Sequence, residues 1–308
     1  MTKKILILGI NGFLGSAMDR YLRGLRGPLR IYGLSRRSSA AAEQNIHVCD
    51  LNDGLRLRQI LGDVRPDVIF HFAGGRFPDD QKMFESNFNT TRNLLESLKG
   101  DQSFKPRVII PGSAAEYGQI SGRKLITENC LPKPLGWYGF VKLLQTDLGL
   151  YYARGGLDVI VVRMFNICGA HTPAHLAIGG FARQIVAIER GKAPVIHTKN
   201  LDGKRDFLDM EDVCRGLWMI AQKGKAGEIY NLCSARPSSI RTLLDKLLTY
   251  TTVKNITVEE NKKDASFSFD VIGSNVKLRS VVDWSPRVSL ERSLHNTLVS
   301  ARNIPGGI

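Results

Sequence analysis

The chain has 308 residues, of which 43% are hydrophobic and 23% charged, and its formal net charge is +14. The length allows one large or two smaller domains, and no apolar run approaches the roughly 20 residues of a membrane span or forms a signal-peptide core. We therefore expect a cytoplasmic protein without a membrane partner, and the scattered cysteines indicate reduced thiols. The basic residues are also dispersed, which favours anionic small molecules over nucleic acid.

The N-terminus has the pattern of a phosphate-binding turn. Residues 3–8 read as a short buried strand, and the glycine-rich turn after them opens a helical pattern. Glycines let the backbone approach a pyrophosphate, and the start of the helix supplies N–H groups and a positive dipole end. We assign cofactor binding here to Gly9, Asn11, Gly12, Phe13, Leu14 and Gly15.

The second predicted strand, residues 29–34, ends in a basic turn. An NAD-binding turn normally carries an acidic residue here for the ribose diol, but this chain has none between Asp19 and Glu43. Ser35, Arg36 and Arg37 suit a 2′-phosphate instead, so the sequence predicts NADP(H), with NAD(H) as the alternative.

Strands continue to alternate with helices up to residue 166, which predicts a Rossmann-type, doubly wound parallel sheet. Further strands are expected at 47–51, 66–72, 107–111 and 157–163, and helices at 53–61, 83–98 and 138–154. Ligands of such sheets lie at the carboxyl ends of the strands. The candidates at these ends are Asp50, Leu51, Phe72, Ala73, Gly74 and Ser113.

Tyr138 and Lys142 are four residues apart, so on a helix they share one face. A lysine ammonium near a phenol favours phenolate and lowers the phenol pKa toward working pH. A phenol tuned in this way can give or take a proton at a carbonyl or carbinol oxygen.

The composition changes after residue 166. We expect a loop at 167–177, helices at 178–190, 211–222, 240–251 and from 290, and a strand at 228–233. The sequence predicts a dinucleotide-binding domain over 1–166, to which segments near 204–233 return, and a mainly substrate-binding α/β domain over 167–308.

Together these features resemble the extended short-chain dehydrogenase/reductase family that acts on nucleotide sugars. The resemblance rests on the Gly9/Gly12/Gly15 turn, Asp50, residues 71–75, Ser113, the Tyr138/Lys142 pair and Arg205-Asp206-Phe207. Within the family, segments 165–166, 180–186, 229–234 and 272–275 are most similar to the GDP-4-keto-6-deoxy-D-mannose reductases.

The resemblance implies NADPH-dependent reduction of the C4 keto group of a nucleotide-linked 4-keto-6-deoxy sugar, with GDP favoured as the nucleotide, by a homodimer. It implies the catalytic residues Ser113, Tyr138 and Lys142, with Tyr138 as the proton donor and Lys142 also on the nicotinamide ribose. It places Asp50 at the adenine, and Ser113, Ala114, Asn166 and Arg205 at the substrate, Arg205 on its diphosphate.

The sequence departs from the family at several positions. Dehydratases of the family carry acidic residues where this chain has Ala114 and Ala115, and Glu116, on an alternating segment, would face away from the site. Trp137 and Val141 replace the usual Pro and Ser around the Tyr–Lys pair. Where related reductases carry an Arg-Pro segment near the substrate phosphates, this chain reads Lys262, Lys263, Asp264, with Asp264 in place of the Arg, which leaves the nucleotide open.

Two alternatives remain. One is a nucleotide-sugar C4 epimerase, which uses the same Ser–Tyr–Lys group with tightly bound NAD; the other is a non-catalytic dinucleotide-binding sensor or scaffold. Hydrolysis is disfavoured, because Ser113 does not lie in G-x-S-x-G. His171 and His175 flank Pro173 without a third ligand, so we expect no metal.

Overall fold

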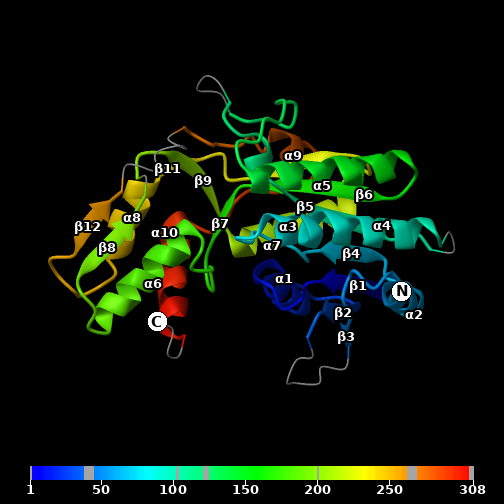
Figure 1. The fold of residues 1–308 in the computed structure, drawn as a ribbon, viewed down its shortest axis with the longest axis horizontal. Coiled ribbons are helices and arrows are strands. Elements are labelled where there is room, and N and C mark those ends of the chain that lie inside the picture. The colour runs from blue at the N-terminus through cyan, green and yellow to red at the C-terminus, as the bar shows by residue number, and fades with distance from the viewer. Residues whose placement is uncertain are drawn as a thin grey trace.

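The computed structural model describes residues 2–37, 45–101, 104–120, 125–199, 201–261 and 269–304. Within these residues a parallel sheet of seven strands runs through the larger part of the molecule, and helices cover both faces (Figure 1). The order is β10-β6-β5-β4-β1-β2-β3. The strands are β1 (Lys3–Leu8), β2 (Leu29–Ser35), β3 (Ile46–Val48), β4 (Val68–His71), β5 (Arg107–Ser113), β6 (Val159–Met164) and β10 (Ile229–Leu232). The expected Rossmann-type α/β architecture is confirmed.

Alternation along β1 separates the hydrophobic cores on the two faces of the sheet. Ile5 and Ile7 face one core, to which α1 and α7 contribute, whereas Leu6 and Leu8 face the other, to which α2, α4 and α5 contribute. The helices are α1 (Phe13–Arg23), α2 (Gly54–Val64), α4 (Thr90–Lys99), α5 (Trp137–Arg154) and α7 (Met210–Lys223). Burial on both faces explains why the central strands are almost continuously apolar.

The helix expected at 83–98 begins three residues earlier and contains a wider turn. It consists of α3 (Asp80–Phe84), the π-helical turn η1 (Glu85–Asn89) and α4. Asp79 caps its start by accepting a hydrogen bond from the Lys82 N–H at 2.6 Å. Across the wide turn the Thr90 and Thr91 hydroxyls donate to backbone carbonyls four residues back. Such π turns occur frequently at functional sites.

The smaller part of the molecule lies at the left of Figure 1. In its described residues a sheet of order β11-β9-β7 pairs β9 in parallel with β7 and antiparallel with β11, and β8 pairs in parallel with β12. Three helices, α6, α8 and α10, share its hydrophobic core. The bounds are β7 (Asn166–Cys168), β8 (Val195–Thr198), β9 (Lys204–Asp209), β11 (Pro237–Ser239), β12 (Thr257–Glu260), α6 (Ala177–Glu189), α8 (Ile240–Leu248) and α10 (Leu290–Arg302). Helix α9 (Val276–Val281) lies on the larger part and packs against β10 (Figure 1).

The short strands β7, β8, β9, β11 and β12 and the helix α9 were not expected from the sequence, whereas the other helices and β10 were. The division into domains at residue 166 stays a prediction. None of the described helices is long and apolar enough to cross a membrane.

Candidate active site

The glycine-rich turn between β1 and α1 is so tight that a side chain does not fit at Gly9 or at Gly15. Gly9 has a φ of +78°, and a Cβ on Gly15 would lie 2.2 Å from the Gly9 carbonyl oxygen. Helix α1 has Gly12 at its N-cap, and no side chain caps the helix. The first N–H groups of α1 therefore face the turn without a side-chain partner, which suits a pyrophosphate.

The carboxyl end of β2 is joined to this turn. The Asn11 amide donates to the Ser35 hydroxyl oxygen at 2.9 Å, and the Arg37 N–H reaches the same oxygen at 3.4 Å. Arg36 and Arg37 are exposed, so their charges are free to meet an anion beside the turn. These residues therefore fit the 2′-phosphate of a dinucleotide.

The other predicted cofactor residues line the ends of β3 and β4. Asp50 is exposed beyond the end of β3, and its carboxylate accepts from the Asn52 N–H at 2.9 Å, whereas Leu51 is buried. Phe72 is also buried. Ala73 is half-buried, and Gly74 is exposed with a φ of +109°.

Ser113 is the last residue of β5, at the carboxyl edge of the sheet. Its hydroxyl oxygen accepts from the Ala115 N–H at 3.2 Å and caps the short 3₁₀ turn η2 (Ala114–Glu116). As expected, Glu116 does not face the site, but the segment that carries it is a 3₁₀ turn and not the alternating segment that the sequence predicted. The 3₁₀ turn curls the Glu116 side chain back, so that its carboxylate accepts from the Ser113 N–H at 2.7 Å.

Glu116 is fully buried and paired behind Ser113. The Arg163 Nε donates to its carboxylate at 2.6 Å, and the Thr146 hydroxyl donates at 2.9 Å. Burial raises the pKa of Glu116, and the Arg163 guanidinium and the Ser113 N–H oppose this rise. Because its carboxylate is buried and accepts hydrogen bonds from protein groups, Glu116 is a structural anion and does not line a substrate pocket.

Tyr138 and Lys142 occupy one face of α5, as predicted. Gly139 allows this helix to approach Ser113 closely, because a Cβ at Gly139 would lie 2.4 Å from the Ala115 carbonyl oxygen. The prediction that Lys142 lowers the phenol pKa is wrong. Burial raises the pKa of Tyr138, opposed by a hydrogen bond from Ser113 and by the charge of Arg76.

Lys142 itself is 4% exposed, and its ammonium donates to the Pro111 carbonyl and to the Gln145 side-chain oxygen. Burial lowers the pKa of Lys142 to about 8, partly offset by the negative charge of Glu116. Two neutral acceptors, neither of them on Tyr138, thus hold the lysine ammonium. Ser113, Tyr138 and Lys142 nonetheless form one group at the end of β5, able to protonate or deprotonate a ligand oxygen.

The predicted substrate residues lie on neighbouring segments. Ala114 is buried beside Ser113, and on β7 the Asn166 amide donates to the Asp206 carbonyl at 3.0 Å. On β9 the Arg205 guanidinium donates to the carbonyls of Lys204 and Phe269. The structure therefore brings Asn166 and Arg205 onto paired strands, but it turns Arg205 toward the chain itself. The basic segment at 262–264 lies outside the described residues.

Asp206 holds several backbone segments together near Arg205, although the sequence identified it only as part of the motif Arg205-Asp206-Phe207. It is fully buried and accepts hydrogen bonds from Ser234, from the Ala235 N–H at 2.8 Å and from the Gly273 N–H at 3.3 Å. Burial raises its pKa to about 6, and the hydrogen bonds oppose that rise. It ties β9 to the segments after β10 and before α9.

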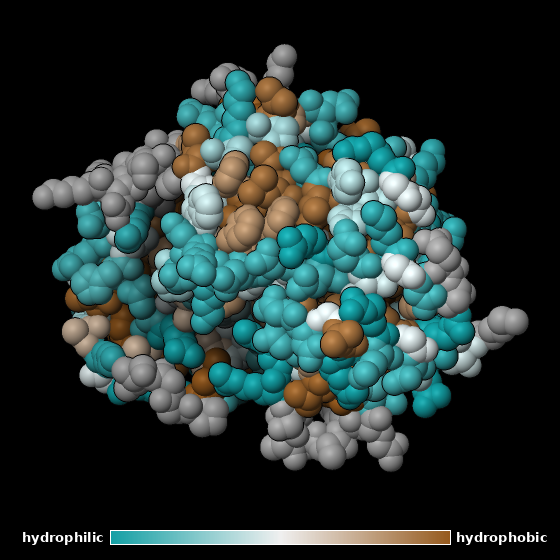
Figure 2. Space-filling model, turned by 45° about the vertical axis from the view of Figure 1, so that its right-hand side comes forward, coloured by the Kyte–Doolittle hydropathy of each residue, from teal (hydrophilic) through white to brown (hydrophobic). Residues whose placement is uncertain are grey.

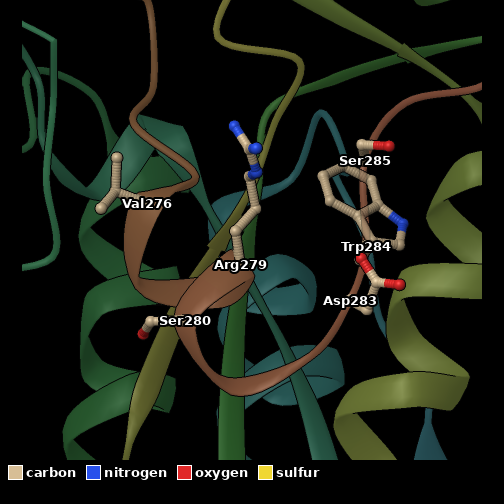
Figure 3. A pocket seen from close by; sticks show the side chains of 6 residues that line it. All are labelled: Val276, Arg279, Ser280, Asp283, Trp284 and Ser285. Carbon is tan, nitrogen blue, oxygen red and sulfur yellow. The ribbon is translucent and has the colours of Figure 1, made fainter.

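A surface pocket of about 320 Å³ lies beside α9 and is lined by Val276, Arg279, Ser280, Asp283, Trp284 and Ser285 (Figure 3). None of these is a predicted site residue. His171 is exposed with a φ of +61°, and among the described residues no group of three or more His, Cys, Asp or Glu side chains could hold a metal ion.

Sequence reasoning missed the buried polar residues behind the site, among them Asn87, Thr91, Gln145 and Arg163. The spacing of Lys142 and Gln145 was an available signal, since residues three apart on a helix are neighbours. The others come from separate elements, and no local pattern marks them.

Comparison with known proteins identifies a family. Residues 5–233 match the model of the "NAD dependent epimerase/dehydratase family". The chain is 28% identical to GDP-6-deoxy-D-mannose reductase of Pseudomonas aeruginosa over 97% of each chain. It is 26% identical to GDP-6-deoxy-D-talose 4-dehydrogenase of Aggregatibacter actinomycetemcomitans, over 96% of this chain and 98% of that one.

A solved structure, that of RMD from Pseudomonas aeruginosa complexed with NADPH, superimposes with a TM-score of 0.84 and 27% identity. The match covers 98% of this chain and 100% of the other. Fold and sequence thus agree, and the chain belongs to the NAD dependent epimerase/dehydratase family of enzymes that modify nucleotide sugars.

Proposed function

We propose that the chain reduces the C4 ketone of a nucleotide-diphosphate 4-keto-6-deoxy sugar, with NADPH as the reductant and GDP as the favoured nucleotide. The meeting of Ser113 and Tyr138 at the end of β5, with alanine at 114 and 115, carries the proposal. These alanines leave no acid for dehydration. The names of the 28% identical reductase and of the NADPH-complexed structure support the same reaction.

The proposed chemistry uses the protonated phenol. NADPH, when bound, supplies the hydride to C4. Because its pKa is raised, Tyr138 holds its proton at neutral pH and can donate it to the C4 oxygen as negative charge develops there. The Ser113 hydroxyl donates a hydrogen bond to the same oxygen. The product is an alcohol, and the phenolate left on Tyr138 is stabilised by the charge of Arg76.

Cofactor binding follows from the glycine turn and the end of β2. The N–H groups at the start of α1 take the pyrophosphate, and Arg36 and Arg37 take the 2′-phosphate of NADPH. Asp50 contacts the adenine, and Lys142 contacts the nicotinamide ribose. NADH, which lacks the 2′-phosphate, is the weaker alternative.

On the substrate side, Ala114 and Asn166 border the sugar, and Arg205 binds the diphosphate. For this role Arg205 exchanges its present carbonyl acceptors for phosphate oxygens. A guanidinium is suited to that exchange, because it donates two parallel hydrogen bonds to a phosphate.

The test is NADPH oxidation, followed by absorbance, with freshly prepared GDP-4-keto-6-deoxy-mannose beside its dTDP and UDP counterparts. Faster NADPH oxidation with the GDP sugar than with the dTDP and UDP sugars supports the proposal, and product NMR then identifies the C4 configuration. Copurified NAD with interconversion of C4 epimers and no net NADPH oxidation would show the epimerase instead. NADPH binding without any turnover of these sugars would contradict the reductase.

We also propose that two copies associate through α5. Phe140 and Tyr151 on this helix are 42% and 60% exposed, and Leu131, Leu135 and Trp137, before the helix and at its start, are exposed as well. Figure 2 shows hydrophobic residues gathered in the upper half of one face of the molecule. Contiguous apolar surface of this kind marks interaction sites. Phe140→Glu should convert a dimer into a monomer in light scattering, whereas Leu55→Glu, on the exposed side of α2, should not. A monomeric wild-type protein at micromolar concentration would contradict this.

A further inference from the structure

The buried ammonium of Lys142 is held by a side chain for which the proposed reaction gives no role. Gln145 lies one helical turn further along α5 and is fully buried. Its carbonyl oxygen accepts from the Lys142 ammonium. Because the Pro111 carbonyl is the other acceptor, Lys142 is held between β5 and its own helix.

The amide nitrogen of Gln145 is bound to a different element. It donates to the Thr91 hydroxyl oxygen at 2.7 Å and to the Asn87 backbone carbonyl at 3.2 Å. The Thr91 hydroxyl donates to the same carbonyl at 2.6 Å. The Asn87 carbonyl belongs to the wide turn η1, so the amide bridges Lys142 to this turn.

This arrangement determines the orientation of the amide. Lys142 can only donate, and the Asn87 carbonyl can only accept. The Gln145 oxygen must therefore face the lysine and its nitrogen must face η1. The Asn87 side chain in turn holds the loop after β4, accepting from the Gly75 N–H at 3.1 Å and donating to the Gly75 carbonyl at 2.8 Å.

The titratable groups described around Lys142 do not replace its positive charge, because each is neutral or already paired. His71, at the end of β4, contacts the Thr91 hydroxyl through Nε2 at 2.8 Å, and its Nδ1 is buried without a partner. Burial and the nearby Lys142 lower the pKa of His71 to about 3, so the ring is neutral. Glu116 is negative but is paired with Arg163, and Tyr138 holds its proton.

We propose that Gln145 is a positioning residue, whose neutral amide fixes the direction of the Lys142 ammonium by tying it to η1. The role in catalysis rests on the proposed function, whereas the effect on Lys142 does not. The neutral amide stabilises the charged lysine by one hydrogen bond, whereas a carboxylate in its place would raise the lysine pKa further. Lys142 can therefore still lose its proton at mildly alkaline pH.

The test uses NADPH fluorescence titrations from pH 6 to 10, which need no sugar substrate. Gln145→Met removes the acceptor, so NADPH affinity should fall about 10- to 100-fold at pH 7. The pH above which affinity is lost should move down by about one unit. Gln145→Glu places a carboxylate beside Lys142, so the same limit should move upward.

Gln81→Met, on the exposed side of α3, is the matched control and should leave both quantities unchanged. If circular dichroism shows that Gln145→Met is not folded, the upward shift of the pH limit in Gln145→Glu remains the deciding observation. Affinity and pH limit equal to those of the control, or a shift of the same sign in both Gln145 variants, would overturn the proposal. If the Gln145 variants shift as expected but the wild-type protein, while binding NADPH, reduces none of the sugars, the proposed function alone is refuted.

With an active substrate, a second readout follows. Gln145→Met should lower kcat by about tenfold or more, because Lys142 acts near the reacting groups, and it should change KM for the sugar little. A rise in KM alone would contradict a positioning role at Lys142.

Discussion

The ion pair between Arg163 and Glu116 is buried behind Ser113, so the stability of the fold should depend strongly on both partners. Arg163→Met removes the guanidinium that lies 2.6 Å from Glu116, while Glu116 stays fully buried with only the Ser113 N–H and the Thr146 hydroxyl as donors. Removing one partner of a buried ion pair costs about 3–5 kcal/mol. Since one pKa unit corresponds to about 1.4 kcal/mol, the pKa of Glu116 should rise by a further two to four units.

The pH dependence follows from that rise. A carboxyl whose pKa is raised in the folded state destabilises the protein fully above the folded pKa, and the cost disappears below the unfolded pKa. The loss of stability in Arg163→Met should therefore be largest at pH 7.5 and should shrink toward pH 5, by about 1.4 kcal/mol per pH unit. Urea unfolding followed by tryptophan fluorescence at several pH values measures this.

Two variants sharpen the experiment. Arg107→Met breaks the partly exposed pair with Asp158, 3.0 Å apart, and should cost about 1 kcal/mol or less. Adding Glu116→Gln to Arg163→Met should restore stability at pH 7.5, because no buried charge is left unpaired. A loss independent of pH, or one no larger than that of Arg107→Met, would refute the assignment of Glu116 as a buried anion.

Three further changes test the proposed site. Tyr138→Phe should lower turnover by about 10²- to 10⁴-fold with NADPH affinity nearly unchanged; unaltered turnover would exclude Tyr138 as the proton donor. Arg36→Ala combined with Arg37→Ala should weaken NADPH about 10- to 100-fold and NADH little, in paired fluorescence titrations, and equal losses would contradict the 2′-phosphate role. Gly15→Ala, whose Cβ would lie 2.2 Å from a carbonyl oxygen, should abolish NADPH binding, whereas Gly62→Ala, with open space around it, should not.

Local patterns in the sequence were sufficient for much of this protein. The first strand was predicted with its observed bounds, and the helix with Tyr138 and Lys142 was placed within one residue of its start. Continuous apolar runs and helical periodicity are properties of neighbouring residues, so they can be read without knowing the fold. The alternation of strands and helices then implied the parallel sheet, whose geometry gathers the ends of β1, β2, β4 and β5 at one edge.

The rest depended on pairing between distant segments. The strands β7, β9 and β11 have three to six residues each, and their pairing joins positions separated by about 30–40 residues, which no local period reveals. Likewise, an extended reading of residues 113–116 missed the 3₁₀ turn that brings Glu116 under Ser113 and against Arg163, since only the packed structure shows it. The direction of the Lys142 ammonium is a similar case. Proximity along a helix predicted a partnership with Tyr138, but burial against β5 and η1 supplied two neutral acceptors, Pro111 and Gln145, that only the tertiary structure brings into reach.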